Sequence, residues 1–367
     1  MFLIILRVIL MTTGFQGDAD MTRFIGVESL AAMVHEVGVD TFLRGLADYI
    51  EADFLRWSQF HKVPRHASHG DIGVVELMPI SDDRLFGFKY VNGHPSNGRH
   101  NLLTVAAFGV LSDMATGYPR LMSEMTLLTA LRTAATSALV ARRLARPDSR
   151  VMAIIGLGAQ SDFQALAFRA LLGIERLRVY DIDPDSTAKF VRNMSARGFR
   201  IEVCDTSQDA VVGADIITTA TADKRNATIL SSNMVGAGVH INAIGGDCPG
   251  KTELQRDILS RAAVFVELEE QTRIEGELQQ MPATFPVTEI WQVLAGMAEG
   301  RTDADQITLF DSVGFALEDF SALRYLDDLA RDSSHVVEID LIAAPSVPVD
   351  LFGLLEAHRA PVPLLAA

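Results

Sequence analysis

A short apolar run that leads directly into a glycine-containing turn limits the possible folds of this chain more than any other feature. The run is VMAII, residues 151–155, the turn GLGAQS spans Gly156–Ser161, and a helical pattern follows. In such a turn the first glycine permits the tight bend, and the second lets the backbone approach a pyrophosphate at the helix N-terminus. Ser161 stands where a third glycine is usual and is still small. The segment predicts a dinucleotide-binding unit; a glycine-rich turn that binds nothing is the alternative.

An acidic residue follows the next apolar run at the place that this interpretation requires. The run LRVY ends at Asp181, and Asp183 follows two residues later. A carboxylate about 20 residues beyond the glycine turn accepts hydrogen bonds from ribose hydroxyls. Because a carboxylate repels a 2′-phosphate, Asp181 favours NAD over NADP. Asp183 is an alternative for the same role.

The second half of the chain alternates apolar runs with helical stretches. After Ser149 the order is VMAIIG, FQALAFRALLG, LRVYDID, STAKFVRNMSARG, ADIITTAT, HINAIGG and AVFVELE. This alternation is typical of a parallel sheet with crossover helices. We therefore predict an α/β fold with a Rossmann-type domain.

The first part of the chain has a different pattern. An amphipathic helical stretch at about 27–60 precedes three strand-like runs, VVELMPI, FGFKYVNG and LLTVAAFGVLSD, and a hairpin turn is expected at 81–84. A long helical pattern, TLLTALRTAATSALVARRLA, ends before Pro147. Near the C-terminus, the pattern at 311–332 predicts a helix that packs back on this first part.

Length, charge and cysteine content narrow the class of protein. A chain of 367 residues is expected to form two domains. The net charge of −15 argues against a nucleic-acid partner and against an anionic membrane surface. The two cysteines, Cys204 and Cys248, form no CxxC pair, so a reducing cytoplasm fits better than a disulfide framework. His61, His66 and His69 match no metal-ligand spacing, and no metal site is predicted.

The first ten residues, MFLIILRVIL, are apolar but too short to span a bilayer, and no charged leader precedes them. Ordinary globular patterning begins at Met21. We expect residues 1–20 to be an extension or to lie upstream of the true start, rather than to form a signal peptide.

A second polar motif follows the apolar run HINAIGG. It is DCPGKTEL, from Asp247 to Leu254, and it places Lys251 four residues after a carboxylate. Loops at the carboxyl ends of parallel strands form the ligand crevice of an open sheet. Asp247 and Lys251 are therefore candidates to contact cofactor and substrate. A helix N-cap is the alternative, since Asp and Thr both cap well.

Several blocks together resemble a known family. They are ELMPI, FKYVNGHP, TVAAFGVLSD, SEMTLLTALRTAATS, GLGAQS, IGGDCPGKTEL, QTRIEGE and DSVGFALED, in this order. The chain resembles the ornithine cyclodeaminase and μ-crystallin family from about residue 21 to residue 328. Within that family, GGDCPGKTE looks more like the cyclodeaminases than the alanine dehydrogenases or the ketimine reductases.

The resemblance implies a domain organisation and an assembly. An NAD-binding Rossmann domain would span 134–312, and an α+β substrate-binding and dimerisation domain would be built from 21–133 and 313–350. Residues 351–367 would form a tail. The family also implies a homodimer and a place in ornithine and arginine metabolism and proline biosynthesis.

The same resemblance assigns site residues. The substrate would contact Arg65, Glu76, Lys89, Arg132, Asp247 and Val313. The cofactor NAD would contact Gly156, Gly158, Ala159, Gln160, Ser161, Asp181, Asp183, Thr219, Thr221, Asp223, Lys251 and Ser312. Thr104 is implied for substrate or cofactor.

The activity of the family explains these residue types. L-Ornithine carries one carboxylate and two amines, which cationic and carboxylate side chains recognise. Three cations exceed the needs of one carboxylate, so one is expected to pair with Glu76 or to reach a cofactor phosphate. Our hypothesis is that a hydride leaves the α-carbon for NAD, the δ-amine closes the ring, ammonia leaves, and the hydride returns to give L-proline. Asp247 would be the acid–base group, and Glu76 would hold an amine.

Three alternatives stay open. One is a net amino-acid dehydrogenase or ketimine reductase of the same family, similar to alanine dehydrogenase. Another is a lysine cyclodeaminase, since one methylene contributes only roughly 1–3 kcal/mol of discrimination. The third is a non-catalytic protein that holds a nucleotide or small ligand, against which the presence of both Glu76 and Asp247 argues.

Overall fold

The computed structural model describes residues 21–221 and 228–357. Two eight-stranded sheets form from these residues, one mainly antiparallel and one parallel. The predicted extension at 1–20 lies outside the described residues, as does the end of the predicted tail, residues 358–367. No helix within the described ranges is long and apolar enough to cross a membrane.

The mainly antiparallel sheet is built from both ends of the chain. Its strands are β1 (Thr22–Ile25), β2 (His61–Lys62), β3 (His66–Gly70), β4 (Gly73–Ser81), β5 (Leu85–Gly93), β6 (Ala107–Asp113), β7 (Pro119–Glu124) and β16 (Val337–Ile339). Their order is β16-β1-β7-β6-β5-β4-β2, and β3 also pairs with β4. The predicted hairpin turn is confirmed, because the Asp82 carboxylate accepts hydrogen bonds of 2.8 Å from the amides of Arg84 and Leu85.

Side chains alternate across this sheet. Along β4, Glu76 and Met78 are buried while Leu77 between them is exposed. Met78 pairs with Lys89 of β5, so Lys89 lies on the buried face as well. Helix α11 (Ala316–Leu329) packs on this face against β4, β5 and β6. The inner face is therefore where polar side chains of β4 and β5 meet the end of the chain.

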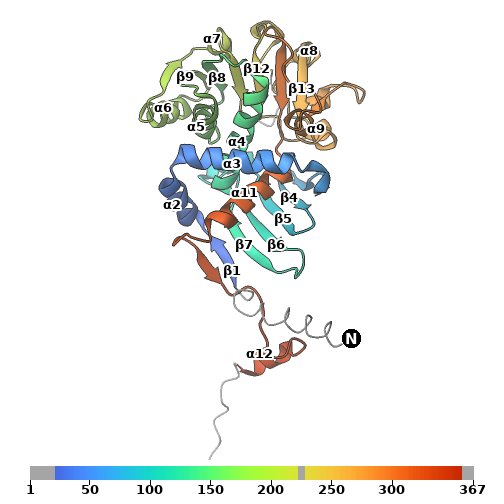
Figure 1. Cartoon of the computed structure of the whole chain (residues 1–367). Helices are drawn as coiled ribbons and strands as arrows, with labels where there is room; N and C mark the ends of the chain where they lie inside the picture. The colour runs from blue at the N-terminus through green and yellow to red at the C-terminus, as the bar shows by residue number, and fades with distance from the viewer. Residues whose placement is uncertain (1–20, 222–227, 358–367) are drawn as a thin grey trace, which may run out of the picture.

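Helices α3 (Val39–Phe54) and α4 (Thr126–Leu144) lie between the two sheets (Figure 1). The helical pattern predicted at 27–60 is two helices, α2 (Val27–Val37) and α3 (Val39–Phe54), because Gly38 adopts a φ of +82° and ends the first. The long predicted helix is confirmed as α4 (Thr126–Leu144). Helix α4 packs on α5 and α3, which joins the two halves of the molecule.

The parallel sheet confirms the predicted α/β alternation. Its strands are β8 (Val151–Ile155), β9 (Arg176–Tyr180), β10 (Arg200–Val203), β11 (Ile216–Thr219), β12 (His240–Ala243), β13 (Ala262–Val266), β14 (Thr288–Glu289) and β15 (Ile307–Asp311). The order is β10-β9-β8-β11-β12-β15-β13-β14, and these pairings are all parallel. The strand order reverses between β8 and β11, and ligands bind at the carboxyl ends beside such a switch point.

Shorter helices flank this sheet. They are α5 (Ser161–Leu172), α6 (Pro184–Ser195), α7 (Ser207–Val211), α8 (Arg256–Arg261), α9 (Glu269–Glu275) and α10 (Ile290–Leu294). Part of the predicted tail forms a last helix, α12 (Leu351–Ala357). Figure 1 shows α12 beyond β1, at the end of the molecule opposite the parallel sheet.

The helix predicted over 311–332 needs a correction. Asp311 is the last residue of β15, and the helix begins only at Ala316. The strand ITLFD is entirely buried between β12 and β13, and a buried apolar run has no period that distinguishes it from a helix. Residues 312–315 thus connect the parallel sheet to α11. The domain boundaries at 133/134 and 312/313 stay a prediction.

Candidate active site

The two sheets are joined at Arg65, which precedes β3. Its Nη2 atom donates hydrogen bonds of 2.6 Å to the carbonyl oxygens of Val313 and Gly314, directly after β15. The inner face of β4 and β5 is thereby held beside the carboxyl ends of the parallel strands. Ligands of open α/β sheets bind at these ends.

The glycine turn has the two features that a pyrophosphate needs. Gly156 adopts a φ of +94°, and a β-carbon there would lie 2.6 Å from the carbonyl oxygen of Ala220, so a glycine is required. A β-carbon at Gly158 would meet nothing within 4 Å, so the space in front of helix α5 is open. Ser161 begins α5 and donates a 2.9 Å hydrogen bond to the Gly158 carbonyl. A dinucleotide fits this cradle.

The two acids after β9 have different surroundings. The carboxylate of Asp181 accepts hydrogen bonds from the amide of Leu157 in the glycine turn and, at 2.8 Å, from the amide of Asp183. Asp183 caps helix α6 instead: it accepts hydrogen bonds from Ser186 and Asp185, which lower its pKa. Asp181 is thus the carboxylate fixed against the glycine turn, while both oxygens of Asp183 serve the cap.

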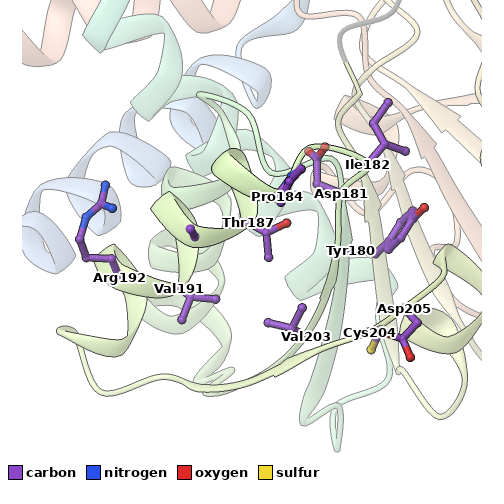
Figure 2. Close-up of a pocket in the computed structure, with 11 residues that line it drawn as sticks. Tyr180, Asp181, Ile182, Pro184, Thr187, Val191, Arg192, Val203, Cys204 and Asp205 are labelled. Atoms are coloured by element: carbon purple, nitrogen blue, oxygen red, sulfur yellow. The ribbon is translucent and has the colours of Figure 1, made fainter.

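A cavity of about 740 Å³ adjoins Asp181. Figure 2 shows its walls, which come from the end of β9, from α6 and from the end of β10. The lining includes Tyr180, Thr187, Val191, Val203 and Asp205. Its mixture of apolar walls and carboxylates suits a ribose and a purine ring.

Thr219 is the last residue of β11, and Thr221 and Lys251 lie in the loops that follow β11 and β12. The hydroxyl of Thr219 is buried, and within the described part of the chain it has no hydrogen-bond partner. The amide of Thr221 donates a 2.8 Å hydrogen bond to Glu253, and its carbonyl accepts one of 2.8 Å from Nζ of Lys251. A buried hydroxyl without a partner is a position that a ligand can complete. The predicted contact Asp223 lies outside the described residues.

Asp247 is the exposed carboxylate of this region. Its side chain is 57% exposed in the loop after β12, and its Oδ1 atom lies 3.7 Å from Nζ of Lys251. Its charge favours the protonated form of Glu275 and the charged form of Arg65. The charge of Asp247 therefore interacts with the cluster that Arg65 and Glu275 form.

Arg65 is the centre of a cluster of acids. Its side chain is 6% exposed, and its Nη1 atom donates a 3.1 Å hydrogen bond to Glu76. Its Nε atom lies 3.1 Å from Oε2 of Glu275, in ion-pair contact but without hydrogen-bond alignment. Of the three predicted cations, Arg65 is thus the one that pairs with Glu76.

Lys89 and Arg132 share a second pair of acids. Nζ of Lys89 lies 2.9 and 2.8 Å from the two oxygens of Asp319, and Nε of Arg132 lies 2.9 Å from the first of them. Arg132 also contacts Glu318. Burial and the charge of Arg132 lower the pKa of Lys89 to about 8, although Asp319 opposes the shift. Both cations are buried on the inner face, where a carboxylate ligand gains most from them.

The loop after β15 is tied to the end of β13. The hydroxyl of Ser312 donates a 2.6 Å hydrogen bond to Glu267, and the amide of Gly314 donates one of 3.1 Å to the same oxygen. Val313 is buried beside them. Burial raises the pKa of Glu267.

Three further predicted contacts, Ala159, Gln160 and Thr104, lie in loops. Gln160 ties the glycine turn to α4 through a 3.0 Å hydrogen bond to the Ala130 carbonyl, and Ala159 is exposed in the turn. Thr104 lies in the loop before β6, where its carbonyl accepts a hydrogen bond from the amide of His94.

The three histidines considered for a metal are separate from these charges. His61, His66 and His69 are exposed on β2 and β3. Over residues 21–221 and 228–357, no three His, Cys, Asp or Glu side chains gather in an arrangement that could hold a metal ion.

Sequence reasoning missed five buried acids of the site: Glu253, Glu267, Glu275, Glu318 and Asp319. Glu267 follows the apolar run AAVFV, which is the same signal that pointed to Asp181 after LRVY. The others lie within the motifs GGDCPGKTEL, QTRIEGE and DSVGFALED, but nothing in their spacing distinguishes them from solvated charges. Their burial depends on which elements pack together, which a single sequence does not give.

Comparison with known proteins decides the family. The model of the ornithine cyclodeaminase/mu-crystallin family matches residues 27–334. The chain belongs to this family. It is 61% identical to an ornithine cyclodeaminase of Agrobacterium fabrum, over 94% of this chain and 97% of that protein.

Solved structures of the family have the same fold. A lysine cyclodeaminase, studied for its recognition of L-lysine, L-ornithine and L-2,4-diaminobutyric acid, matches with a TM-score of 0.86 and 31% identity over 91% of this chain and 99% of its own. An archaeal alanine dehydrogenase, a dimer with bound NAD, matches with a TM-score of 0.81 and 28% identity over 88% of this chain and all of its own. The predicted fold class is thereby confirmed.

Proposed function

We propose that this family member converts L-ornithine to L-proline and ammonia. The observation that carries the proposal is the charge pattern of the site: buried cations and several carboxylates gather at the carboxyl ends of a parallel sheet with a dinucleotide cradle. A substrate with one carboxylate and two ammonium groups complements this pattern. The similar protein of Agrobacterium fabrum carries the name of this activity.

The proposed cofactor is NAD, which supplies a hydride acceptor that becomes a hydride donor within the same turnover. Its pyrophosphate would lie at Gly156, Gly158, Ala159, Gln160 and Ser161, and its ribose would bind Asp181, with Asp183 as the weaker candidate. The remaining assigned contacts are Thr104, Thr219, Thr221, Asp223, Lys251 and Ser312. The preference for NAD rests on the carboxylate of Asp181.

The proposed substrate contacts form two groups, one for the carboxylate of the substrate and one for its ammonium groups. Lys89 and Arg132 would bind the substrate carboxylate, because they are two cations gathered around one shared acid, Asp319. Arg65 is a single cation between two acids, Glu76 and Glu275. Glu76 and Asp247 would hold the ammonium groups, and Val313 would line the pocket. Asp247 is the proposed acid–base group, since it is the exposed carboxylate that a substrate amine can reach.

Two related activities are the alternatives. A lysine cyclodeaminase would use the same charges with one more methylene of substrate, and a net dehydrogenase would need only one ammonium group in the site. The cluster of Glu76, Asp247 and Arg65 favours a diamino acid over alanine, because its acids outnumber its cation.

We also propose a homodimer formed through the outer face of the antiparallel sheet. Leu77, Tyr90 and Phe108 lie side by side across β4, β5 and β6, and the rings of Tyr90 and Phe108 are 5.1 Å apart. Leu77 and Phe108 are 39% and 36% exposed. An apolar row whose two outer members are exposed supports contact with a second copy of the chain.

The location and role in the cell are further parts of the proposal. Neither Cys204 nor Cys248 takes part in a disulfide, which supports a reducing cytoplasm. Proline formation would place the protein in ornithine and arginine metabolism. The domain assignment proposed above, with NAD bound by 134–312, accords with the position of the glycine cradle.

A trace of cofactor distinguishes these activities. The purified protein is incubated with L-ornithine and NAD at one hundredth of the substrate concentration. The proposal predicts near-complete conversion to proline and ammonia without accumulating NADH. Turnover that stops once all of the added NAD has been reduced to NADH would contradict the proposal. Steady NADH production from L-alanine would contradict it as well. Faster turnover of L-lysine to a six-membered ring would favour the lysine alternative.

A further inference from the structure

The acids around Arg65 outnumber its single charge. Glu76 and Glu275 each lie 3.1 Å from a guanidinium nitrogen, and the charge of Asp247 acts on both Arg65 and Glu275. Within the described ranges, Glu275 pairs with no cation other than Arg65. This end of the site is therefore net negative and suits ammonium groups rather than a carboxylate.

The proposed reaction requires two proton acceptors. L-Ornithine enters with both amines protonated at neutral pH. The α-ammonium must lose its proton before the α-carbon can give up a hydride, and the δ-ammonium must lose its proton before its lone pair attacks that carbon. Both protons return at the end of the turnover, one to the released ammonia and one to the ring nitrogen of proline. Two acceptors are needed between these points, and the acid–base role proposed above for Asp247 would supply one of them.

Glu275 is better placed to accept the second proton than Glu76. Glu76 already accepts an aligned hydrogen bond from Arg65. Oε2 of Glu275 is buried and, among the described residues, receives no hydrogen bond. Burial raises the pKa of Glu275 to about 7; Arg65 lowers it, and the charges of Glu76, Asp247 and Glu267 raise it.

The backbone around Glu275 is fixed. Glu275 is the last residue of α9, and the next residue, Gly276, packs so closely on Asp311 that a β-carbon there would lie 2.6 Å from its carboxylate. Asp311 also accepts a 2.9 Å hydrogen bond from the amide of Glu277. The position of Glu275 relative to β15 and Arg65 is thereby set by buried contacts on both sides.

We propose that Glu275 is the second proton acceptor of the reaction and takes up a proton that the ammonium groups of ornithine must lose. Asp247 takes the other proton. This inference rests on the proposed function and adds Glu275 of the motif QTRIEGE to its residues.

The test compares Glu275→Gln with Glu270→Gln, an exposed position on the same helix. Glutamine keeps the size of the side chain but accepts no proton. Glu275→Gln is expected to lower kcat about 100-fold or more while KM changes less than about threefold. In the wild type, kcat should fall as the pH drops below about 7, because a protonated Glu275 accepts nothing; this acidic limb should be lost in Glu275→Gln.

Binding without turnover gives an independent measurement. Calorimetry of L-ornithine binding in the absence of cofactor, in two buffers of different ionisation enthalpy, counts the protons released. The wild type and Glu270→Gln should release part of a proton per site at pH 7, because an ammonium group beside Glu275 favours its carboxylate. Glu275→Gln should release less.

The outcomes separate this inference from the proposed function. A wild type that forms no proline contradicts the function, whereas a wild type that forms proline together with an active Glu275→Gln variant overturns only the role of Glu275. A change in KM alone would also overturn it, since that result means that Glu275 only positions Arg65. If Glu275→Gln does not fold, Glu275→Asp is measured instead. The kcat of Glu275→Asp should still fall at low pH as in the wild type, and a kcat that no longer falls at low pH would contradict the proposal.

Discussion

Nζ of Lys89 lies within hydrogen-bonding distance of both carboxylate oxygens of Asp319, at 2.9 and 2.8 Å. Both side chains are almost completely buried. Lys89 comes from β5 of the antiparallel sheet and Asp319 from the first turn of α11, more than 200 residues later in the chain. Because burial lowers the pKa of Lys89 and Asp319 raises it, this contact decides whether Lys89 is charged at neutral pH.

The first prediction follows from this contact. The pKa of Lys89 is lowered to about 8, so its charge is present below that pH and is lost as the pH rises through it. If Lys89 binds the substrate carboxylate, KM for L-ornithine should be constant below about pH 7 and should rise above pH 8. Asp319→Asn removes an interaction that favours the charged form, so the rise should begin at lower pH. At pH 7.5, KM should increase about tenfold or more.

Steady-state kinetics between pH 6 and 9.5 measures this effect. Asp332→Asn, at an exposed position after α11, is the matched control and should keep the wild-type profile. A profile of Asp319→Asn that coincides with the wild type would show that Lys89 does not bind the carboxylate.

A second prediction concerns Asp247. Replacing it with alanine should abolish turnover, with kcat reduced by about 10²–10⁴, because the acid–base group is removed. NAD binding, measured by fluorescence titration, should change less than about threefold, since the glycine cradle lies on a different loop. Asp257→Ala, an exposed position on α8, is the control. Normal proline formation by Asp247→Ala would refute the role assigned to this residue.

The two glycines of the cradle allow a paired test of cofactor binding. At Gly158 a β-carbon meets nothing, so Gly158→Ala should fold with an unchanged Tm but should weaken NAD binding about tenfold or more, by filling the space for the pyrophosphate. At Gly156 a β-carbon would collide with Ala220, and the positive φ adds strain of about 1–2 kcal/mol. Gly156→Ala should therefore lower the Tm. Equal NAD affinity of Gly158→Ala and the wild type would place the pyrophosphate elsewhere.

The outer face of the antiparallel sheet gives a prediction about assembly. Phe108→Glu should shift the protein toward the monomer in sedimentation analysis, because a charge would interrupt the apolar row of Leu77, Tyr90 and Phe108. Val212→Glu, which changes a 61%-exposed side chain on the parallel-sheet half, should leave the assembly unchanged. A Phe108→Glu variant with the wild-type mass in solution would exclude this face as the interface.

The sequence predicts β8, β9, β11, β12 and β13 of the parallel sheet and β4, β5 and β6 of its partner sheet, but not the short strands of either. The runs at 151–155 and 240–243 are apolar, end at glycine or polar residues and alternate with helices, so their period and length suffice. Strands β1 and β16 were missed because they are short and their pairing brings together the two ends of the chain. Strand β15 was missed because a fully buried strand lacks the alternation of β4.

Among the site residues, too, the sequence reveals those that a local pattern marks and misses those that depend on packing between distant segments. Asp181 and Asp247 were found because each follows an apolar run that forms a strand, which is a local signal. Asp319 and Glu275 were not, since an acid in a helix usually faces solvent. Their burial results from Arg65, Lys89 and Arg132, which come from three distant segments of the chain. The sequence shows that these acids and cations are present, but it does not show which acid pairs with which cation.

The central claim is that the hydrogen removed from the α-carbon of ornithine returns to the same carbon after the ring closes. L-Ornithine deuterated at the α-carbon, supplied with a trace of unlabelled NAD, tests this claim most directly, and mass spectrometry of the proline measures the label. The account predicts proline that retains nearly all of the deuterium at its α-carbon, with none accumulating in reduced cofactor. Proline without the label, or label collected in NADH, would contradict it.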